Sequence, residues 1–220
     1  MKFRLTTRDS PARVAVAPTV IPAERIKVRY RNMRVLDFDI ENRPLTYLGS
    51  DFTTGEVTAI SWAWDDSDVT VRLLGETDIP DILREFVAAW DRADLVSGHY
   101  CRGHDIPMIN GALLECGMPP LADMWVSDTK LDLVRMKGIS RSQESLSEMQ
   151  ALEQSKVHMT QFRWRAANRL TPAGLAYVRE RVIGDVRQHM ALRRKLMQGG
   201  YLGPAKLWKS GNARVGQYQP

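Results

Sequence analysis

The stretch RVLDFDIE, residues 34–41, decides the fold of this protein. Its hydrophobic residues alternate with others over eight positions, and Asn-Arg-Pro at 42–44 closes it, which is the pattern of a β-strand. Side chains alternate between the two faces of a strand, so three acids share one face: Asp37, Asp39 and Glu41. Such carboxylates repel one another on a central strand, and we expect a cation to neutralise them. A solvated, exposed face is the alternative.

Outward from this strand, the hydrophobic periodicity and the turn residues predict the other elements. The expected strands are 56–64, 69–74, 95–100 and 125–129, and the expected helices are 79–93, 105–116, 145–152 and 172–198. Three meander strands are thus followed by alternating helices and strands. This order predicts an α/β fold, with a mixed β-sheet (an antiparallel meander plus parallel strands) flanked by helices.

The length and the charge distribution suggest how the chain is divided. A chain of 220 residues suits one domain with extensions, and we expect a basic arm at 1–30, the domain at 31–200 and a basic tail at 201–220. The net charge is +5, but residues 1–34 hold nine Lys or Arg against two acids, and residues 187–220 hold seven and no acid. An acidic centre between basic ends suits a protein that binds cations at one site and a polyanion around it. Solvated termini are the alternative.

Composition excludes several classes of protein. No apolar run of about 18 residues exists, so we expect no membrane span. The two cysteines form no CxxC pair, which excludes a zinc knuckle and a disulfide framework and favours a cytoplasmic protein. The four histidines show neither HxxxH nor HExxH spacing, so zinc-hydrolase chemistry is not indicated.

Two further acids stand where a metal site could use them. Asp105 opens a predicted helix, and Asp185 lies within the last one beside Gly184. Each has an ordinary explanation, because Asp105 could be an N-cap and Asp185 a solvated helix position. Together with Asp39 and Glu41 they would form an oxygen-only ligand set, which selects Mg²⁺ or Mn²⁺.

Four segments, in this order, carry a family resemblance: FDIE at 38–41, GHYCRGHDIP at 98–107, SDT at 127–129 and GDV at 184–186. They resemble the motifs of the DEDD, or DnaQ-like, 3′–5′ exonuclease family. The resemblance extends to the phage-encoded members of that family. The resemblance covers roughly residues 33–198. It implies the RNase H-like fold, and hydrolysis of phosphodiester bonds from a 3′ end with two Mg²⁺ or Mn²⁺ ions.

The same resemblance implies a role for each acid. Asp39 would bridge the two ions, and Glu41 and Asp185 would complete the shell of the first ion. Asp105 would act largely through water. Asp37 would support these ligands without touching the ions.

The chain departs from the family where a helper of the attacking water is expected. The family has Tyr four residues, or His five residues, before its last aspartate, and here those positions are Arg181 and Glu180. Arginine stays protonated and cannot act as a base, so we expect Arg181 to be a catalytic residue that holds the scissile phosphate. An ion pair with Asp185 or Glu180 that steadies the helix is the alternative. The second motif has Tyr100 where Asn is usual and His104 where an aromatic residue is usual.

Cations gather near the end of the last helix, and we expect them to bind the nucleic-acid backbone: Arg187, Arg193, Arg194 and Lys195. A favourable basic end to the helix is the plainer interpretation. DNA is expected in preference to RNA, in replication, repair or proofreading. A DNA polymerase or another replisome component is a candidate partner. The expected location is the cytoplasm, and this includes the cytoplasm of a phage-infected bacterium.

Two other functions stay open. The protein could be a nucleic-acid- or polymerase-binding module that keeps the acids without a working base, as Arg181 suggests. It could also be a metal-dependent endonuclease or resolvase on the same fold, which would need no free 3′ end.

Overall fold

The computed structural model describes residues 33–45, 55–65, 67–153 and 158–210. In chain order the elements are β1 (Val35–Pro44), β2 (Gly55–Trp64), β3 (Thr70–Leu73), α2 (Ile79–Trp90), β4 (Leu95–Gly98), α3 (Asp105–Glu115), β5 (Met124–Asp128), α4 (Gln143–Met149), α5 (Gln161–Asn168), α6 (Pro172–Gln198) and β6 (Lys206–Trp208). The expected N-terminal arm at 1–30 lies outside the described residues. None of the described helices has the length and apolar character needed to cross a bilayer.

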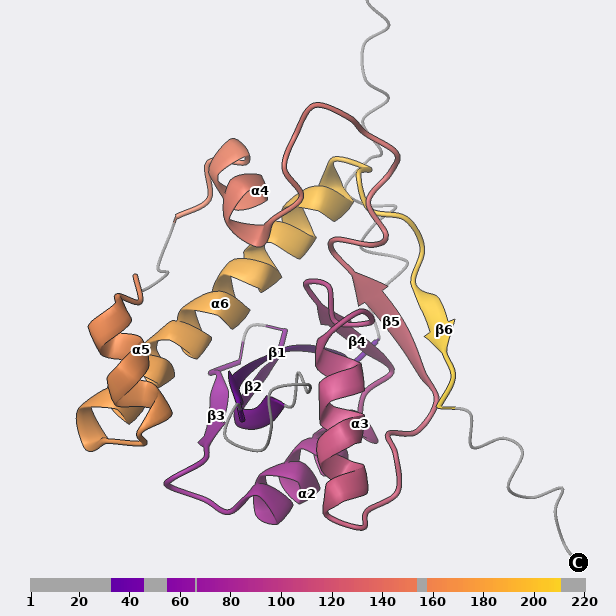
Figure 1. The fold of residues 1–220 in the computed structure, drawn as a ribbon. Helices are drawn as coiled ribbons and strands as arrows, with labels where there is room; N and C mark the ends of the chain where they lie inside the picture. Colours follow the sequence, from indigo (N-terminus) through magenta and orange to yellow (C-terminus); the bar gives the residue numbers. More distant parts are fainter. Residues whose placement is uncertain (1–32, 46–54, 66, 154–157, 211–220) are drawn as a thin grey trace, which may run out of the picture.

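The strands form one mixed sheet with β1 near its centre (Figure 1). The strand order is β3-β2-β1-β4-β5-β6. The meander β1-β2-β3 is antiparallel, β1, β4 and β5 run parallel, and β6 returns antiparallel to β5. The predicted fold class, an α/β fold with a mixed sheet flanked by helices, is confirmed.

The apolar face of β1 builds the main core together with α2 and α3. Leu36, Phe38 and Ile40 are all buried in this cluster. The ring of Phe38 lies 5.3 Å from that of Phe86 and 6.1 Å from that of Trp90, both from α2. Burial of these large side chains is the principal stabilising contribution on this side of the sheet.

Helix α6 contacts β1, β2 and β3 from the other side of the sheet (Figure 1). Its bounds agree with the prediction, because Thr171 caps the first turn by accepting from the Gly174 backbone N–H at 3.1 Å, and Pro172 follows the cap. A side chain at Gly174 would meet the Ala166 backbone at 2.2 Å. Glycine there lets α6 lie directly against α5.

Two elements were not predicted. The sequence of helix α5 shows no apolar periodicity, in agreement with the burial of only one of its residues, Ala167. Strand β6 lies in the expected tail at 201–220, but it pairs with β5, and the ring of Trp208 lies 6.0 Å from that of Trp90. The folded part of the chain therefore extends to residue 208 at least, beyond the expected boundary at 200. Residues 211–220 lie outside the described part.

A buried ion pair joins α6 to the acidic face of β1. Asp37 is fully buried, and its two carboxylate oxygens accept from Arg193 at 2.8 and 2.7 Å. Burial by itself raises the pKa of Asp37, but Arg193 and a hydrogen bond with His189 outweigh it and hold that pKa at about 2. Asp37 is therefore ionised at neutral pH.

Removing one partner of this ion pair should destabilise the protein strongly. Replacing Arg193 with Met leaves the Asp37 carboxylate buried without its main counter-ion, and removal of one partner of a buried pair costs about 3–5 kcal/mol. Urea unfolding should show this loss for Arg193→Met. In the double variant with Asp37→Asn the loss should be smaller than the sum of the two single losses.

The matched control is Arg34→Met. Arg34 pairs with Asp94 at 3.0 Å, but both side chains are exposed, so the loss should stay below about 1 kcal/mol. Equal losses for the two arginine variants would show that the buried pair does not hold α6 on the sheet.

Candidate functional site

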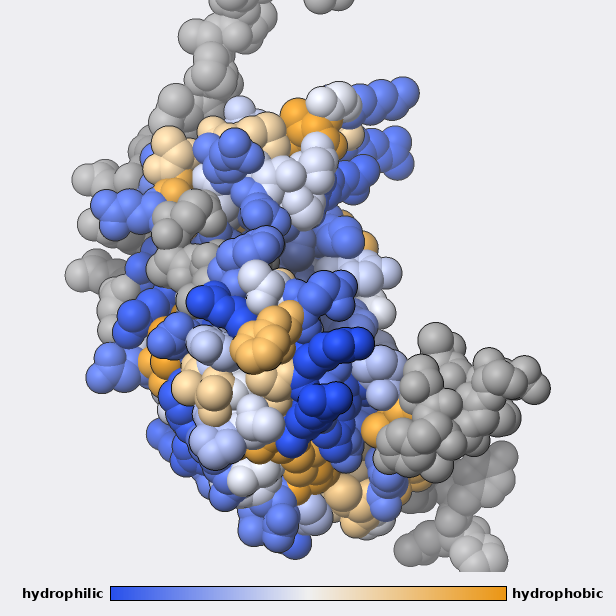
Figure 2. Space-filling view, turned by 60° about the vertical axis from the view of Figure 1, so that its left-hand side comes forward, coloured by the Kyte–Doolittle hydropathy of each residue, from blue (hydrophilic) through white to orange (hydrophobic). Residues whose placement is uncertain are grey.

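One cavity collects residues from distant parts of the chain. It has a volume of about 350 Å³ and is lined by the far half of β1, the loops after β4 and β5, the beginning of α4, and the middle of α6. Blue, hydrophilic side chains prevail on the face of the molecule around α4, α5 and α6, with apolar ones scattered between them (Figure 2). A polar surface of this kind suits a polar or charged ligand.

Three of the four predicted metal ligands line this cavity. Asp39 and Glu41 come from β1, and Asp185 comes from α6 and is 5% exposed. The alternation of β1 places both of its acids on the side of α6, where Asp185 faces the same space. Two segments more than 140 residues apart therefore supply one group of carboxylates.

The fourth predicted ligand, Asp105, does not line the cavity. It is the first residue of α3, is 4% exposed, and accepts a hydrogen bond from the Ile40 backbone N–H at 3.3 Å. Its carboxylate is therefore fixed to β1 between the positions of Asp39 and Glu41. Burial, and then the charges of Asp128 and Glu41, raise the pKa of Asp105 to about 7, against the lowering effect of its backbone hydrogen bonds.

Arg181 lies among the carboxylates of the cavity. Its Nε donates to Glu41 Oε1 at 2.6 Å and lies 3.4 Å from Asp185 Oδ2. Its guanidinium also lies over the ring of Trp164 at 5.4 Å. Burial lowers the pKa of Arg181, but Asp185 and Glu41 outweigh burial and raise it. The ion pair with Asp185 that the sequence offered as an alternative is present, and Glu41 joins it.

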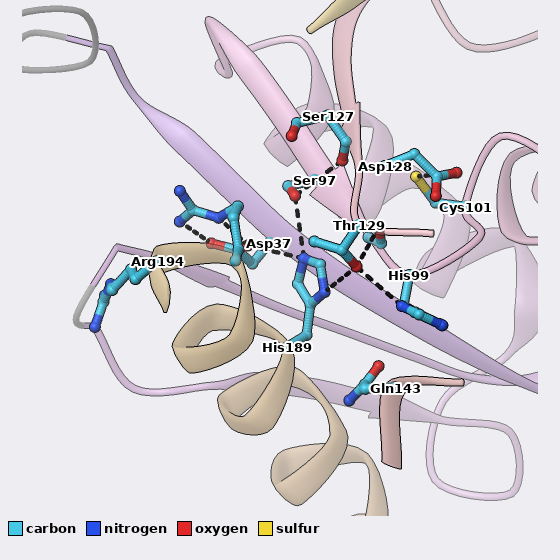
Figure 3. Close-up of polar contacts among 12 residues, drawn as sticks. Asp37, Ser97, His99, Cys101, Ser127, Asp128, Thr129, Gln143, His189 and Arg194 are labelled. Carbon is cyan, nitrogen blue, oxygen red and sulfur yellow. Dashed lines mark hydrogen bonds and ion pairs between the residues drawn. The ribbon is translucent and has the colours of Figure 1, made fainter. Parts of the chain in front are cut away.

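A chain of buried polar side chains, which the sequence did not reveal, leads from Asp37 to the cavity (Figure 3). His189 Nε2 lies 3.1 Å from Asp37 Oδ1, and His189 Nδ1 lies 3.3 Å from Thr129 Oγ1. Thr129 Oγ1 in turn lies 3.0 Å from Nδ1 of His99, a residue that lines the cavity. The one sequence signal was the spacing of four between Asp185 and His189. Burial lowers the pKa of His99 to about 4, so this imidazole is neutral at pH 7.

Asp128 organises the two loops that border the cavity. It is fully buried and accepts hydrogen bonds from four backbone N–H groups, those of Tyr100, Arg102, Lys130 and Leu131, at 2.9 to 3.1 Å. Tyr100 has a φ of +67°, a strained conformation for an aromatic residue, and the Lys130 Nζ lies 4.0 Å from its ring centre. Such strain persists only where the surroundings enforce it, and it is common at functional sites.

The predicted cation strip on α6 needs one correction. Arg193 is 4% exposed and bound to Asp37, so it cannot contact a nucleic-acid backbone at the surface. Arg194 donates to the Asp65 backbone carbonyl at 3.1 Å. Arg187 and Lys195 are exposed and remain candidates.

The donor chemistry of the cavity fits a hard divalent cation. Carboxylate oxygens are the ligands that Mg²⁺ and Mn²⁺ prefer, and Asp39, Glu41 and Asp185 supply them. The guanidinium already held by two of these acids shows that the group attracts a cation. Among the described residues, no group of three carboxylate, imidazole or thiol side chains lies close enough together to hold one ion.

Comparison with known proteins shows the fold. No protein-family model matches the sequence, and no curated protein matches it. The structure is similar to that of a family B DNA polymerase from the hyperthermophilic archaeon Pyrobaculum calidifontis, with a TM-score of 0.56 and 19% identity over 75% of this chain. The matched region is 24% of that chain, so this protein corresponds to about a quarter of the polymerase. The similarity supports an RNase H-like α/β fold; membership of the DEDD family stays a prediction.

The raised pKa of Asp105 predicts a pH dependence of stability. An acid whose pKa is higher in the folded protein holds its proton more tightly there, so metal-free protein should lose stability as the pH rises from about 4 to about 7. The loss attributable to Asp105 is about 4 kcal/mol at most, at 1.36 kcal/mol per pH unit. Asp105→Asn keeps the acceptor for the Ile40 N–H without the charge and should remove this part of the slope.

Urea unfolding in EDTA at pH 5 and pH 8 measures the slope. Asp91→Asn, at an exposed acid beyond α2, is the matched control and should leave the slope as in the wild type. An unchanged slope in Asp105→Asn would contradict the assignment.

Proposed function

We propose that the protein is a metal-dependent 3′–5′ exonuclease that hydrolyses phosphodiester bonds of nucleic acid, with DNA preferred over RNA. The observation that carries the proposal is the meeting of Asp39, Glu41 and Asp185 in one polar cavity. The structural similarity to a DNA polymerase chain supports a role with nucleic acid. Replication, repair or proofreading, with a polymerase or replisome component as partner, is the proposed setting.

The three carboxylates of the cavity would hold the ions. Divalent ions held there would supply activation of a water and stabilisation of the leaving oxygen. Asp105 would fix the β1 backbone between Asp39 and Glu41 through its hydrogen bond to Ile40, and would act on the ions largely through water, as the family resemblance implies. In this proposal its role is closer to that of a positioning residue than the sequence motif implies.

The size of the cavity suits the end of a strand. Its volume of about 350 Å³ lies at the small end of ligand sites, which span about 300–1,000 Å³. In this proposal it would receive the terminal nucleotide of a strand. Lys130 at its edge would bind a phosphate oxygen, while the Asp128 hydrogen bonds keep the lysine loop in place.

A second candidate is a nucleic-acid- or polymerase-binding module without catalytic activity. The contacts of Arg181 with Glu41 and Asp185 favour it, because a guanidinium fixed there would occupy ligands that the ions need. Cleavage assays distinguish the two functions.

The test uses 5′-labelled single- and double-stranded DNA and RNA, and closed circular DNA, with Mn²⁺ or with EDTA. The exonuclease should give a ladder of progressively shortened products that requires Mn²⁺ and a free 3′ end. Asp39→Asn and Asp185→Asn should each slow cleavage by at least about 100-fold, the scale of losing one electrostatic contribution to the transition state. The folded state of both variants is checked by circular dichroism.

Asp91→Asn lies away from the cavity and should cleave at the wild-type rate. Nicking of closed circles would instead indicate an endonuclease, and binding without any cleavage would indicate the second candidate. Normal cleavage by Asp39→Asn would refute the assignment of the site.

A further inference from the structure

The position of Arg181 raises the question of how a cation could enter the site. Its Nε contacts Glu41 at 2.6 Å and Asp185 at 3.4 Å, and all three side chains are less than a fifth exposed. Two of the acids assigned to the ions are therefore already in contact with a positive charge that belongs to the protein.

Electrostatics explains why the guanidinium lies there. Asp39, Glu41 and Asp185 line one small cavity, and partly buried like charges repel strongly unless a cation is near. The carboxylates of Asp185, Glu41 and Asp39 all raise the pKa of Arg181. Without a metal ion, Arg181 is the counter-ion that makes this group of acids tolerable in the folded protein.

We propose that Arg181 is a displaceable counter-ion: it occupies the carboxylate group of the metal-free protein, gives way when a divalent cation binds, and then contacts the phosphate of the nucleic acid. This inference rests on the metal dependence in the proposed function. It replaces a fixed role for Arg181 with a change of partners.

The ring of Trp164 can stabilise the guanidinium of Arg181 after it leaves the carboxylates. The guanidinium already lies over the ring of Trp164 from α5, and a cation–π contact depends on the face of the ring more than on one donor atom. The side chain can therefore turn its Nε away from Glu41 while keeping this contact. The guanidinium fork suits a phosphate as well as a carboxylate, so the exchange keeps Arg181 paired throughout.

The exchange couples the two ligands of the site. A metal ion must compete with Arg181 for Glu41 and Asp185, which weakens metal binding to the free protein. A phosphate that binds Arg181 removes this competitor, so nucleic acid should tighten metal binding, and by reciprocity the metal should tighten nucleic-acid binding. The protein would then assemble its full site only on a substrate.

The first test is Mn²⁺ binding, measured by isothermal titration calorimetry without nucleic acid. Arg181→Gln removes the competing charge and should bind Mn²⁺ roughly 10-fold more tightly than the wild type, within the range typical of coupled sites. Arg181→Lys, which keeps a point charge, should lie between the two. Metal-free Arg181→Gln should also melt at a lower temperature and gain more from saturating Mn²⁺.

Arg179→Gln is the matched control on the same helix. Arg179 also forms an ion pair, with Glu76, but both side chains are about 40% exposed and neither lines the cavity. Its replacement should leave the affinity for Mn²⁺ unchanged.

A second readout follows the guanidinium itself. Adding Mg²⁺ should change tryptophan emission in the wild type, because Arg181 shifts over the Trp164 ring. The change should be absent in Trp164→Phe and in Arg181→Gln.

The outcomes separate the inference from the proposed function. If the wild type binds Mn²⁺, Asp39→Asn does not, and Arg181→Gln binds no more tightly than the wild type, the counter-ion role is wrong and the metal site stands. If only Arg181→Gln binds Mn²⁺, the counter-ion role is supported in its strongest form. If neither the wild type nor Arg181→Gln binds Mn²⁺, the metal-dependent function is wrong and the counter-ion role is wrong with it.

Discussion

The contact of Arg193 and His189 with the buried carboxylate of Asp37 is the constraint on which the rest of the structure depends. It ties α6 to the central strand at a point that water does not reach. Because an ionised carboxylate in the core tolerates little displacement from its partners, the contact also fixes the position of α6 along β1. The cavity lies further along the same helix and strand, so its geometry follows from this anchor.

Helix and strand thereby match charges along their shared face, with one exception. Arg193 lies at one end of the row and Arg181, spaced from it by multiples of four, lies at the other, where it contacts Glu41. Between the two arginines the helix row contains Asp185 and His189; His189 contacts Asp37, whereas Asp185 lies near another acid, Asp39 of the strand. In the middle of the interface the acids therefore outnumber the arginines. The proposed cation site lies in this middle part, where Arg181 is in contact with both Glu41 and Asp185.

The parts of this arrangement that depend on local pattern could be predicted from the sequence. The alternation in β1 and the cap, proline and terminal glycines of α6 are local signals; the bounds of α6 were predicted to the residue, whereas β1 continues three residues beyond its predicted end at Glu41, through Pro44. Partners could not be predicted, since they depend on which elements meet. Arginine is usually exposed at the surface of a protein, but Arg193 is buried because Asp37 lies opposite it. Likewise, α5 and β6 owe their form to packing against α6 and β5, and their own sequences contain little periodicity.

Strand β6, three residues long, has a consequence for the protein in concentrated solution. It covers one side of β5, and β3, at four residues, forms the opposite border of the described sheet. A long border strand presents a row of unpaired backbone groups to which another chain can add. With both borders this short, a second copy of the protein finds few such groups to pair with. The shortness of these two border strands thereby protects the described sheet against edge-to-edge aggregation.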